Sequence, residues 1–599
     1  MPLARLSNIG LGLSLVFCSA VSLSPQASKS QGTFAVKTQS SETAKRHHYR
    51  IDLRIDFDAL SYEGSERVRW INRADKSTAV VYFHLYQNLR SSDLPNSHNL
   101  SANGATADEP RMEVTGVFDA LDAPLTYSLD EHGTILRVNL REQVPTGATA
   151  EIQVRFKGTV PEIDPEETGL ATHVVKQVSA ALRAEREVRR ARDINFRCRG
   201  VMLLGTAYPV LAVREGDEWQ RKVEVTVGDF VFSEAADYEV RIETASGVTA
   251  VAPGVEISSS TGALQSRTFA ASALRDFPVM AGRALRTEHA NVEGVTISSV
   301  FLPEHERVGK RVLAIASNAL KAFSSAFGPL PFKSLCIAEA PLVAGLGSTE
   351  FSGFNVIASA FYVDFDSPAM RNLPGIIRDQ RPAVEESVEW TIAHLVAHQW
   401  WGATIGNDPA REPVLDEALA CWSAFLYYRA TYGHEKAAAA LEDQVRGVYR
   451  LYRTFGGEDM DANRPAHDFR NTFQYAAIVI AKGGLMFAAL ERQLGPEKLS
   501  AGIRSYYQAN LFEIAELDDL RAAIIAESPI EQRRTVSRTF SRWLSARRGD
   551  EDIAPPDAEL ATSLGIPAKS RESKGGERNA FAAFARLGKF FWQQMTRIR

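Results

Sequence analysis

Two histidines separated by three residues are the first feature of this sequence that could do chemistry. His394 and His398 lie within the segment 382–406, whose pattern predicts a helix. On a helix this spacing turns about 400°, so both imidazoles leave the same face one turn apart. Two such nitrogens can bind one Zn²⁺ ion at about 2.0–2.1 Å. Because so short a motif also arises by chance, a third ligand is required.

Glu417 is the candidate third ligand. It follows His398 with eighteen residues between them and lies near the start of the next predicted helix, 414–433. Two antiparallel helices joined by a loop would bring its carboxylate beside the histidines. Three protein ligands and one open position are typical of a catalytic zinc site. We therefore expect one Zn²⁺ held by His394, His398 and Glu417; a hydrogen-bonded polar cluster without metal is the alternative.

The elements that position these residues change character along the chain. From 46 to 292 apolar and polar residues alternate, which predicts strands at 49–57, 65–71, 150–156, 221–228 and 237–244. From 293 to 550 the period is mostly helical, with predicted helices at 305–328, 382–406 and 414–433 and a short strand at 334–342. The predicted class is α+β and multidomain, with a β-rich domain followed by a mostly helical one.

The residues near the N-terminus predict export, and those near the C-terminus predict a basic tail. Residues 1–27 resemble a signal peptide, with Arg5 before the apolar stretch Ile9–Leu23, and 28–45 reads as a flexible leader. A periplasmic or cell-envelope location follows, while cleavage, lipidation at Cys18 and an uncleaved anchor stay open. Residues 551–599 are predicted to be a linker and a basic amphipathic tail, which either docks on the body or binds a membrane surface.

Composition and charge narrow the functional classes. The net charge is −5 and the pI about 6.2, which gives no basic footprint for nucleic acid. Cys198, Cys336 and Cys421 form no disulfide framework, although a Cys198–Cys336 pair stays open. The charged run 180–193 is expected to be a solvated helix or loop rather than a binding patch.

The motifs around these ligands resemble the membrane alanyl aminopeptidase family of gluzincin zinc metallopeptidases. HLVAHQWWG (394–402) and LDEALA (415–420) are similar to the family's HExxHQWWG and LNEGFA, with the same gap. GLGSTEFSG (345–353) resembles its exopeptidase motif, and FHLYQN (83–88), YPVL (208–211) and RDFPVMAG (275–282) are further matches. The similarity runs from about 46 to 547.

The resemblance implies a fold, a partner and site residues. The expected fold is a saddle-like β domain followed by a thermolysin-like zinc metallopeptidase domain, as in a short bacterial-type member. The expected partners are peptide N-termini. The exopeptidase motif places Glu350 on the free α-amine of the substrate, with Gly347 as a second substrate-binding position.

Two residues that perform the family's chemistry are missing. Leu395 replaces the glutamate that acts as general base, and Ile480 replaces the tyrosine that hydrogen-bonds the oxyanion. Tyr475, five residues earlier, is not assumed to reach. Losing a general base typically costs about 10²- to 10⁴-fold in rate, and losing an oxyanion donor about 10²- to 10³-fold. We therefore expect weak or no peptidase activity. An active aminopeptidase with a non-standard proton shuttle and a membrane-associated peptide-binding or scaffold protein are the alternatives.

Overall fold

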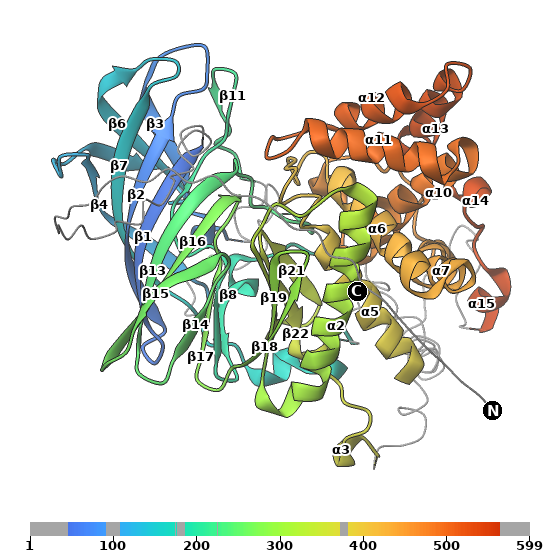
Figure 1. The fold of residues 1–599 in the computed structure, drawn as a ribbon, viewed down its shortest axis with the longest axis horizontal. Coiled ribbons are helices and arrows are strands. Elements are labelled where there is room, and N and C mark those ends of the chain that lie inside the picture. Colours follow the sequence, from blue (N-terminus) through green and yellow to red (C-terminus); the bar gives the residue numbers. More distant parts are fainter. Residues whose placement is uncertain are drawn as a thin grey trace, which may run out of the picture. The chain divides into compact units, whose positions relative to one another are not determined.

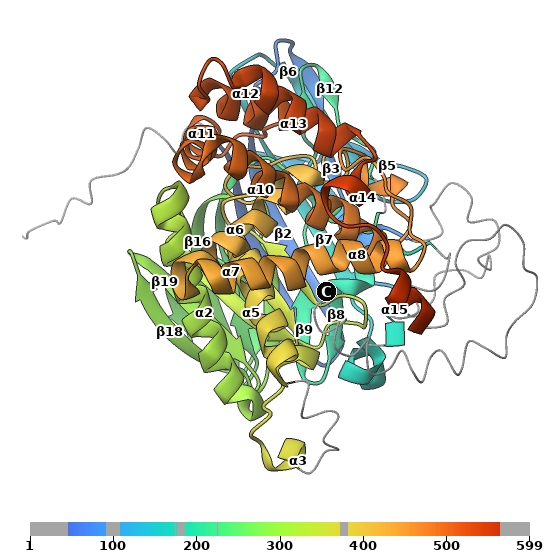
Figure 2. The ribbon, with the colours of Figure 1, turned by 90° about the vertical axis from the view of Figure 1, so that its right-hand side faces the viewer.

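The structure is a computed structural model that describes residues 46–90, 108–173, 175–176, 186–223, 226–371 and 381–563. The predicted signal peptide, the leader and most of the predicted C-terminal tail lie outside the described residues. In the unit that begins at Lys45, the sheets lie on the left of Figure 1 and the helices on the right. Figure 2 shows the same helices in front of the sheets.

A seven-stranded sheet forms much of the β-rich part, as the alternating pattern predicts. Along β1, buried Tyr49, Ile51, Leu53 and Ile55 alternate with exposed charged residues, because successive side chains of a strand point to opposite faces. The strands, in their order across the sheet, are β15 (Val255–Ser260), β16 (Leu264–Leu274), β13 (Ala236–Ala245), β1 (His47–Asp56), β2 (Ser61–Ile71), β7 (Thr149–Thr159) and β4 (Arg111–Asp119).

Smaller sheets complete the β-rich part and lead to the helices. One contains β10 (Val210–Leu211), β3 (Thr78–His84), β6 (Ile135–Val144) and β5 (Thr126–Leu129), and another β14 (Thr249–Val251), β17 (Val279–Gly282), β9 (Val201–Leu204) and β8 (Asn195–Cys198). A hairpin joins β11 (Arg214–Glu215) to β12 (Glu218–Trp219). The mixed sheet that underlies the site contains β18 (Arg286–Val292), β19 (Val295–Phe301), β20 (Ser334–Ala340), β22 (Phe354–Ala358) and β21 (Ser348–Phe351).

Helices form most of the rest of the described chain, as the change of period predicts. They are α2 (Glu306–Phe327), α3 (Pro368–Arg371), α5 (Arg381–Ala397), α6 (Val414–Tyr432), α7 (His434–Leu441), α8 (Gly447–Thr454), α9 (Thr472–Tyr475), α10 (Gly483–Leu494), α11 (Pro496–Ala509), α12 (Leu517–Glu527), α13 (Arg533–Ser545), α14 (Gly549–Asp552) and α15 (Ala558–Ser563). Helices α2 and α6 both pack against α5. The α+β class is thus confirmed.

Three local predictions were wrong. No strand forms at 221–223 or 226–228, because the backbone there contacts an irregular segment, with Arg189 N donating to Thr226 O at 2.8 Å. The helix predicted at 382–406 ends at Ala397 and continues as turns, in which Gly402 has φ +97°. Residues from 551 to 563 are not simply a linker, since α14 and α15 include part of them and Asp557 N donates to Thr454 Oγ1 at 2.9 Å.

The helical run Thr472–Leu494 is long and apolar enough to cross a membrane by length and composition alone. However, 89% of its apolar window is buried inside the protein. This burial is typical of the core helix of a globular domain.

Cys198, Cys336 and Cys421 are buried and form no disulfide with one another, so the Cys198–Cys336 pair that the sequence left open does not form. Burial raises the pKa of the Cys198 thiol to about 11. Such thiols are inert at neutral pH because the thiolate is the reactive form.

Lys482 links three segments of the helical part from a fully buried position. Its ammonium lies 2.8 Å from Asp459 Oδ1 and donates to the carbonyls of Met460 and Ala546 at 2.7 and 2.9 Å. Asp459 Oδ2 in turn accepts from Gly549 N at 2.8 Å. Lys482 therefore has a structural role.

Replacing this lysine is expected to destabilise the protein strongly. Lys482→Met leaves the buried Asp459 carboxylate without its cation, and removing one partner of a buried pair costs about 3–5 kcal/mol. Thermal unfolding of the variant checks this against Lys498→Met, an exposed position on α11, where the cost should stay within about 0.5 kcal/mol. Equal melting temperatures for the two variants would contradict the structural role.

Candidate metal centre

The predicted ligands come together at the junction of two helices. His394 lies in the last turn of α5, His398 directly follows the end of that helix, and Glu417 lies in the first turn of α6. Both histidines are buried, and the Glu417 side chain is 13% exposed. A carboxylate in the first turn of a helix is also favoured by the helix dipole.

The distances between the donor atoms fit a single metal ion. His394 Nε2 lies 2.9 Å from His398 Nε2, and Glu417 Oε2 lies 3.2 and 3.7 Å from these two nitrogens. A tetrahedral ion with ligand bonds of about 2.0–2.1 Å separates its ligand atoms by about 3.3 Å. Glu417 Oε2 is buried and accepts no hydrogen bond from the described residues. The donor set therefore fits Zn²⁺.

Other groups orient two of the ligands. Tyr475 Oη donates to Glu417 Oε1 at 3.2 Å, on the opposite side of the carboxylate from the histidines. His398 Nδ1 faces Trp401 O at 3.2 Å and Asp416 Oδ2 at 3.8 Å. Such partners fix the tautomer and the orientation of metal ligands. The site thus has three donors and, around two of them, neighbouring groups that hold them in position.

The charges of these groups are strongly interdependent. Burial lowers the pKa of His398, but Glu350, Glu417 and Asp416 outweigh it and raise the pKa to about 10. Burial acts to raise the pKa of Glu417, yet its interactions with the neighbouring His394 and His398 bring it well below its usual value. Metal binding must therefore displace a proton from His398, since a metal ligand is the neutral imidazole.

The predicted amine-binding residue lies beside the metal ligands. Glu350 is on β21, and its Oε1 lies 3.8 Å from His398 Nε2. Gln399 holds this strand in place, because its amide accepts from Gly353 N at 2.7 Å and donates to Phe351 O at 3.1 Å. The amine-binding role of Glu350 stays a prediction.

Gly347 lies immediately before β21 and shapes the backbone there. Its carbonyl accepts from Ala358 N at 2.9 Å, and a Cβ at this glycine would come within 3.1 Å of the Phe361 ring. Close packing explains why a glycine is placed here. Its substrate-binding role stays a prediction.

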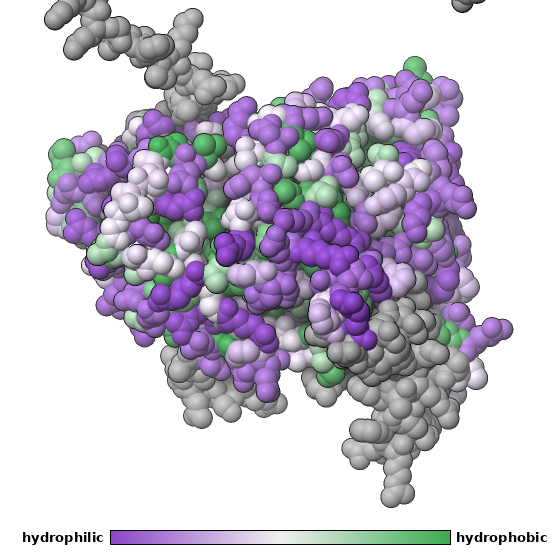
Figure 3. All heavy atoms as spheres, turned by 60° about the horizontal axis from the view of Figure 1, so that its bottom comes forward, coloured by the Kyte–Doolittle hydropathy of each residue, from purple (hydrophilic) through white to green (hydrophobic). Residues whose placement is uncertain are grey.

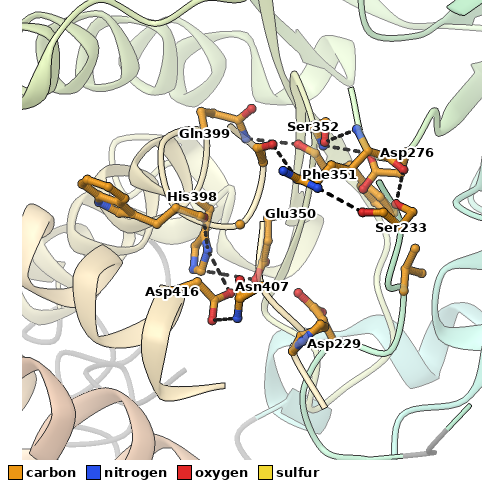
Figure 4. A pocket seen from close by; sticks show the side chains of 16 residues that line it. Asp229, Ser233, Asp276, Glu350, Phe351, Ser352, His398, Gln399, Asn407 and Asp416 are labelled. Atoms are coloured by element: carbon orange, nitrogen blue, oxygen red, sulfur yellow. Dashed lines mark hydrogen bonds and ion pairs between the residues drawn. The ribbon is translucent and has the colours of Figure 1, made fainter. Parts of the chain in front are cut away.

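A pocket next to the ligands is lined by acidic residues. Figure 4 shows Glu350, His398 and Asp416 near one another, with Asp229 coming from the segment before β13. Burial and then the neighbouring Glu350 raise the pKa of Asp229 to about 7, against the opposing effect of Arg189. Arg189 also forms an ion pair with Asp229.

Sequence reasoning missed both residues of this pair. Arg189 belongs to the run 180–193, which was expected to be solvated; instead Ala191, Arg192 and Asp193 are buried. Arg192 pairs with Glu167 at 2.5 Å. The many arginines in this run were the only sign that it forms ion pairs, but the sequence did not specify which carboxylates they pair with.

The two positions at which the resemblance implies the catalytic glutamate and tyrosine hold apolar side chains in or against the core. Leu395 is fully buried, and Ile480 is partly buried within a π-helix, Ala476–Lys482. Glu389 is also occupied elsewhere, because its Oε1 accepts from Tyr427 and Tyr432 at 2.6 and 2.5 Å. Tyr475, in contrast, does reach the site, contrary to the sequence-based caution.

Comparison with known proteins agrees with this geometry. Residues 374–543 match the family model described as Peptidase family M1 domain. The solved M1 zinc metallopeptidase from Deinococcus radiodurans has a TM-score of 0.56 and 14% identity, covering 86% of this chain and 96% of that chain. A mutant of that enzyme bound to a Tyr-Ser-Ala substrate gives a TM-score of 0.55 at 15% identity, covering 84% and 95%.

The curated relatives are longer proteins. Aminopeptidase M1-B of Oryza sativa subsp. japonica is 22% identical over 262 residues, which are 40% of this chain and 26% of that protein. Aminopeptidase RNPEPL1 of Mus musculus is 25% identical over 195 residues, which are 30% and 26% of the two chains. The match spans about a quarter of the length of each relative. Residues 374–543 of this chain therefore match the Peptidase family M1 domain, and the chain has the fold of the solved M1 zinc metallopeptidases.

Proposed function

We propose that this chain is an exported protein that binds one Zn²⁺ ion and the N-terminus of a peptide, with weak or no peptidase activity. The observation that carries the proposal is the contrast within one helix. His394 and His398 converge with Glu417 on one point, while Leu395 between them has no group that can accept a proton. The export part rests on the sequence of residues 1–27 alone.

Different residues of the site would bind the metal ion and the peptide N-terminus. His394, His398 and Glu417 would hold the ion, which when bound polarises a carbonyl and lowers the pKa of water to about 7. Glu350 and Asp229 present carboxyl groups to the pocket, and a free α-ammonium group pairs with such groups. Ser352 N donates to Asp276 Oδ1 at 2.8 Å, which fixes the floor of the pocket next to Glu350.

The membrane-associated alternative gains no support from the face shown in Figure 3. Hydrophilic residues predominate among the coloured residues there, and apolar ones are scattered among them. A membrane-binding face would gather apolar residues into one contiguous patch. The basic tail, on which this alternative rests, lies outside the described residues.

A second candidate function, an active zinc aminopeptidase that uses a non-standard proton shuttle, is favoured by Asp229. Its carboxyl group lines the pocket beside Glu350, and its pKa of about 7 suits a general base at neutral pH. Asp229 is also paired with Arg189, however, which favours the charged form and holds it in place. The assay below separates the two functions.

The purified protein is expected to hydrolyse aminoacyl-anilides very slowly. Without the base at position 395, turnover should lie about 10²- to 10⁴-fold below that of an ordinary enzyme, whose kcat is about 10 s⁻¹. Rates are measured with and without a chelator, and again for Asp229→Asn. Chelator-sensitive turnover at ordinary rates would refute the proposal. Such turnover, if Asp229→Asn abolished it, would favour the second candidate.

A further inference from the structure

Tyr475 is a buried group whose contact with the metal centre neither the sequence nor the family pattern specified. Its side chain is 5% exposed, and its hydroxyl donates to Oε1 of Glu417 at 3.2 Å. The other oxygen, Oε2, faces both histidines at 3.2 and 3.7 Å. The two oxygens of the Glu417 carboxylate thus have different partners: Oε1 accepts from Tyr475, and Oε2 faces the histidines.

An irregularity of the helix explains how Tyr475 gets there. The helix α9 ends at Tyr475, the π-helix Ala476–Lys482 follows, and α10 continues from Gly483. In an α-helix, five residues turn about 500°, which would place Tyr475 about 140° away from Ile480. Hydrogen bonds of a π-helix span five residues, so here Tyr475 lies one turn before Ile480 on nearly the same side.

The surroundings fix the position of the hydroxyl. The ring of Phe469 packs edge-on against Tyr475 with a centroid distance of 5.7 Å. Gly228 lies close to the hydroxyl, since a Cβ there would come within 3.0 Å of Tyr475 Oη. The absence of a side chain at Gly228 therefore leaves the room that the hydroxyl occupies.

We propose that Tyr475 is a positioning residue of the metal centre. By holding Oε1 of Glu417, its hydroxyl directs Oε2 toward His394 and His398, so the three donors converge before the metal binds. The inference rests on the proposed zinc binding but goes beyond it. It states that Tyr475 determines how tightly Zn²⁺ binds, not only that Zn²⁺ binds. Removing such a partner of a metal ligand typically lowers metal affinity by about 10- to 100-fold.

The test is the Zn²⁺ affinity of the full-length protein, measured by competition with a chromogenic chelator. Tyr475→Phe is expected to weaken binding by about 10- to 100-fold. The matched control is Tyr449→Phe, since Tyr449 is equally buried and its hydroxyl also donates to a carboxylate, that of Asp550 at 3.3 Å. The control should bind Zn²⁺ like the wild type, and thermal unfolding of both metal-free variants reports any purely structural effect.

A second variant keeps the inference testable if Tyr475→Phe does not fold. Gly228→Ala places a methyl group about 3.0 Å from the hydroxyl, which then has to shift by a few tenths of an ångström, so Zn²⁺ affinity should fall while the tyrosine itself remains. Wild-type affinity in Tyr475→Phe, or in Gly228→Ala where Tyr475→Phe does not fold, would overturn the positioning role and leave the proposed function intact. A wild-type protein that binds no Zn²⁺ would overturn the proposed function, and the inference with it.

Discussion

Leu395→Glu is expected to raise the turnover of aminoacyl-anilides by about 10²- to 10⁴-fold over the wild type, the usual contribution of a general base. The site lacks this group while it retains the metal donors and Glu350. Residue 395 lies three positions before His398, so the two side chains are neighbours on the helix surface. A carboxylate at 395 would therefore lie beside the metal ligands.

The size of the new side chain must be separated from its basicity. Leu395→Gln is the matched control, because glutamine has the same shape as glutamate but cannot act as a base at neutral pH. We expect no gain in rate from Leu395→Gln. A gain of similar size in both variants, or in neither while Zn²⁺ is bound, would mean that the missing base is not what limits the activity.

The oxyanion position can be tested in the same background. The hydroxyl of Tyr475 is engaged by Glu417, so it does not replace a donor at position 480. Adding Ile480→Tyr to Leu395→Glu should give a further increase of up to about 10²- to 10³-fold, although two groups that act on one transition state need not add. Failure of the double variant would show that the pocket has diverged beyond these two residues.

The metal ligands could be predicted from the sequence because their geometry is local. A spacing of four residues on a helix places His394 and His398 on one face whatever the rest of the chain does. Glu417 required only two adjacent helices, and α5 and α6 do pack against each other. Strands such as β1 were predicted for the same reason, since burial alternates with every second residue.

The rest of the site depends on contacts between distant segments, which no local pattern specifies. Asp229 and Arg189 are forty residues apart and meet in the site only through the tertiary fold. Tyr475 was not assumed to reach the site because it lies five residues before Ile480 in the sequence. The π-helix that changes its direction leaves no clear signal in the run of small and apolar residues between Tyr475 and Lys482.

His398→Ala is expected to abolish Zn²⁺ binding. The variant keeps only two of the three donors, and a catalytic zinc site requires three protein ligands. Metal analysis after equilibration with Zn²⁺ should give about one ion per chain for the wild type and close to none for the variant. His434→Ala, at an exposed position in α7, is the control and should bind like the wild type. Equal, low zinc in the wild type and His398→Ala would refute the site.

Zn²⁺ binding should also raise the free energy of unfolding, and the Zn²⁺ affinity should depend on pH. At a free Zn²⁺ concentration of about 1,000 times Kd, binding stabilises the folded state by about 4.1 kcal/mol, and His398→Ala loses this increment. Because the surrounding carboxylates raise the pKa of His398 to about 10, the ion must displace its proton. Wild-type affinity should therefore rise by about tenfold per pH unit between pH 6 and 8. The unfolded chain does not bring these carboxylates beside His398. A rise of this size would therefore indicate that they already surround His398 in the folded protein.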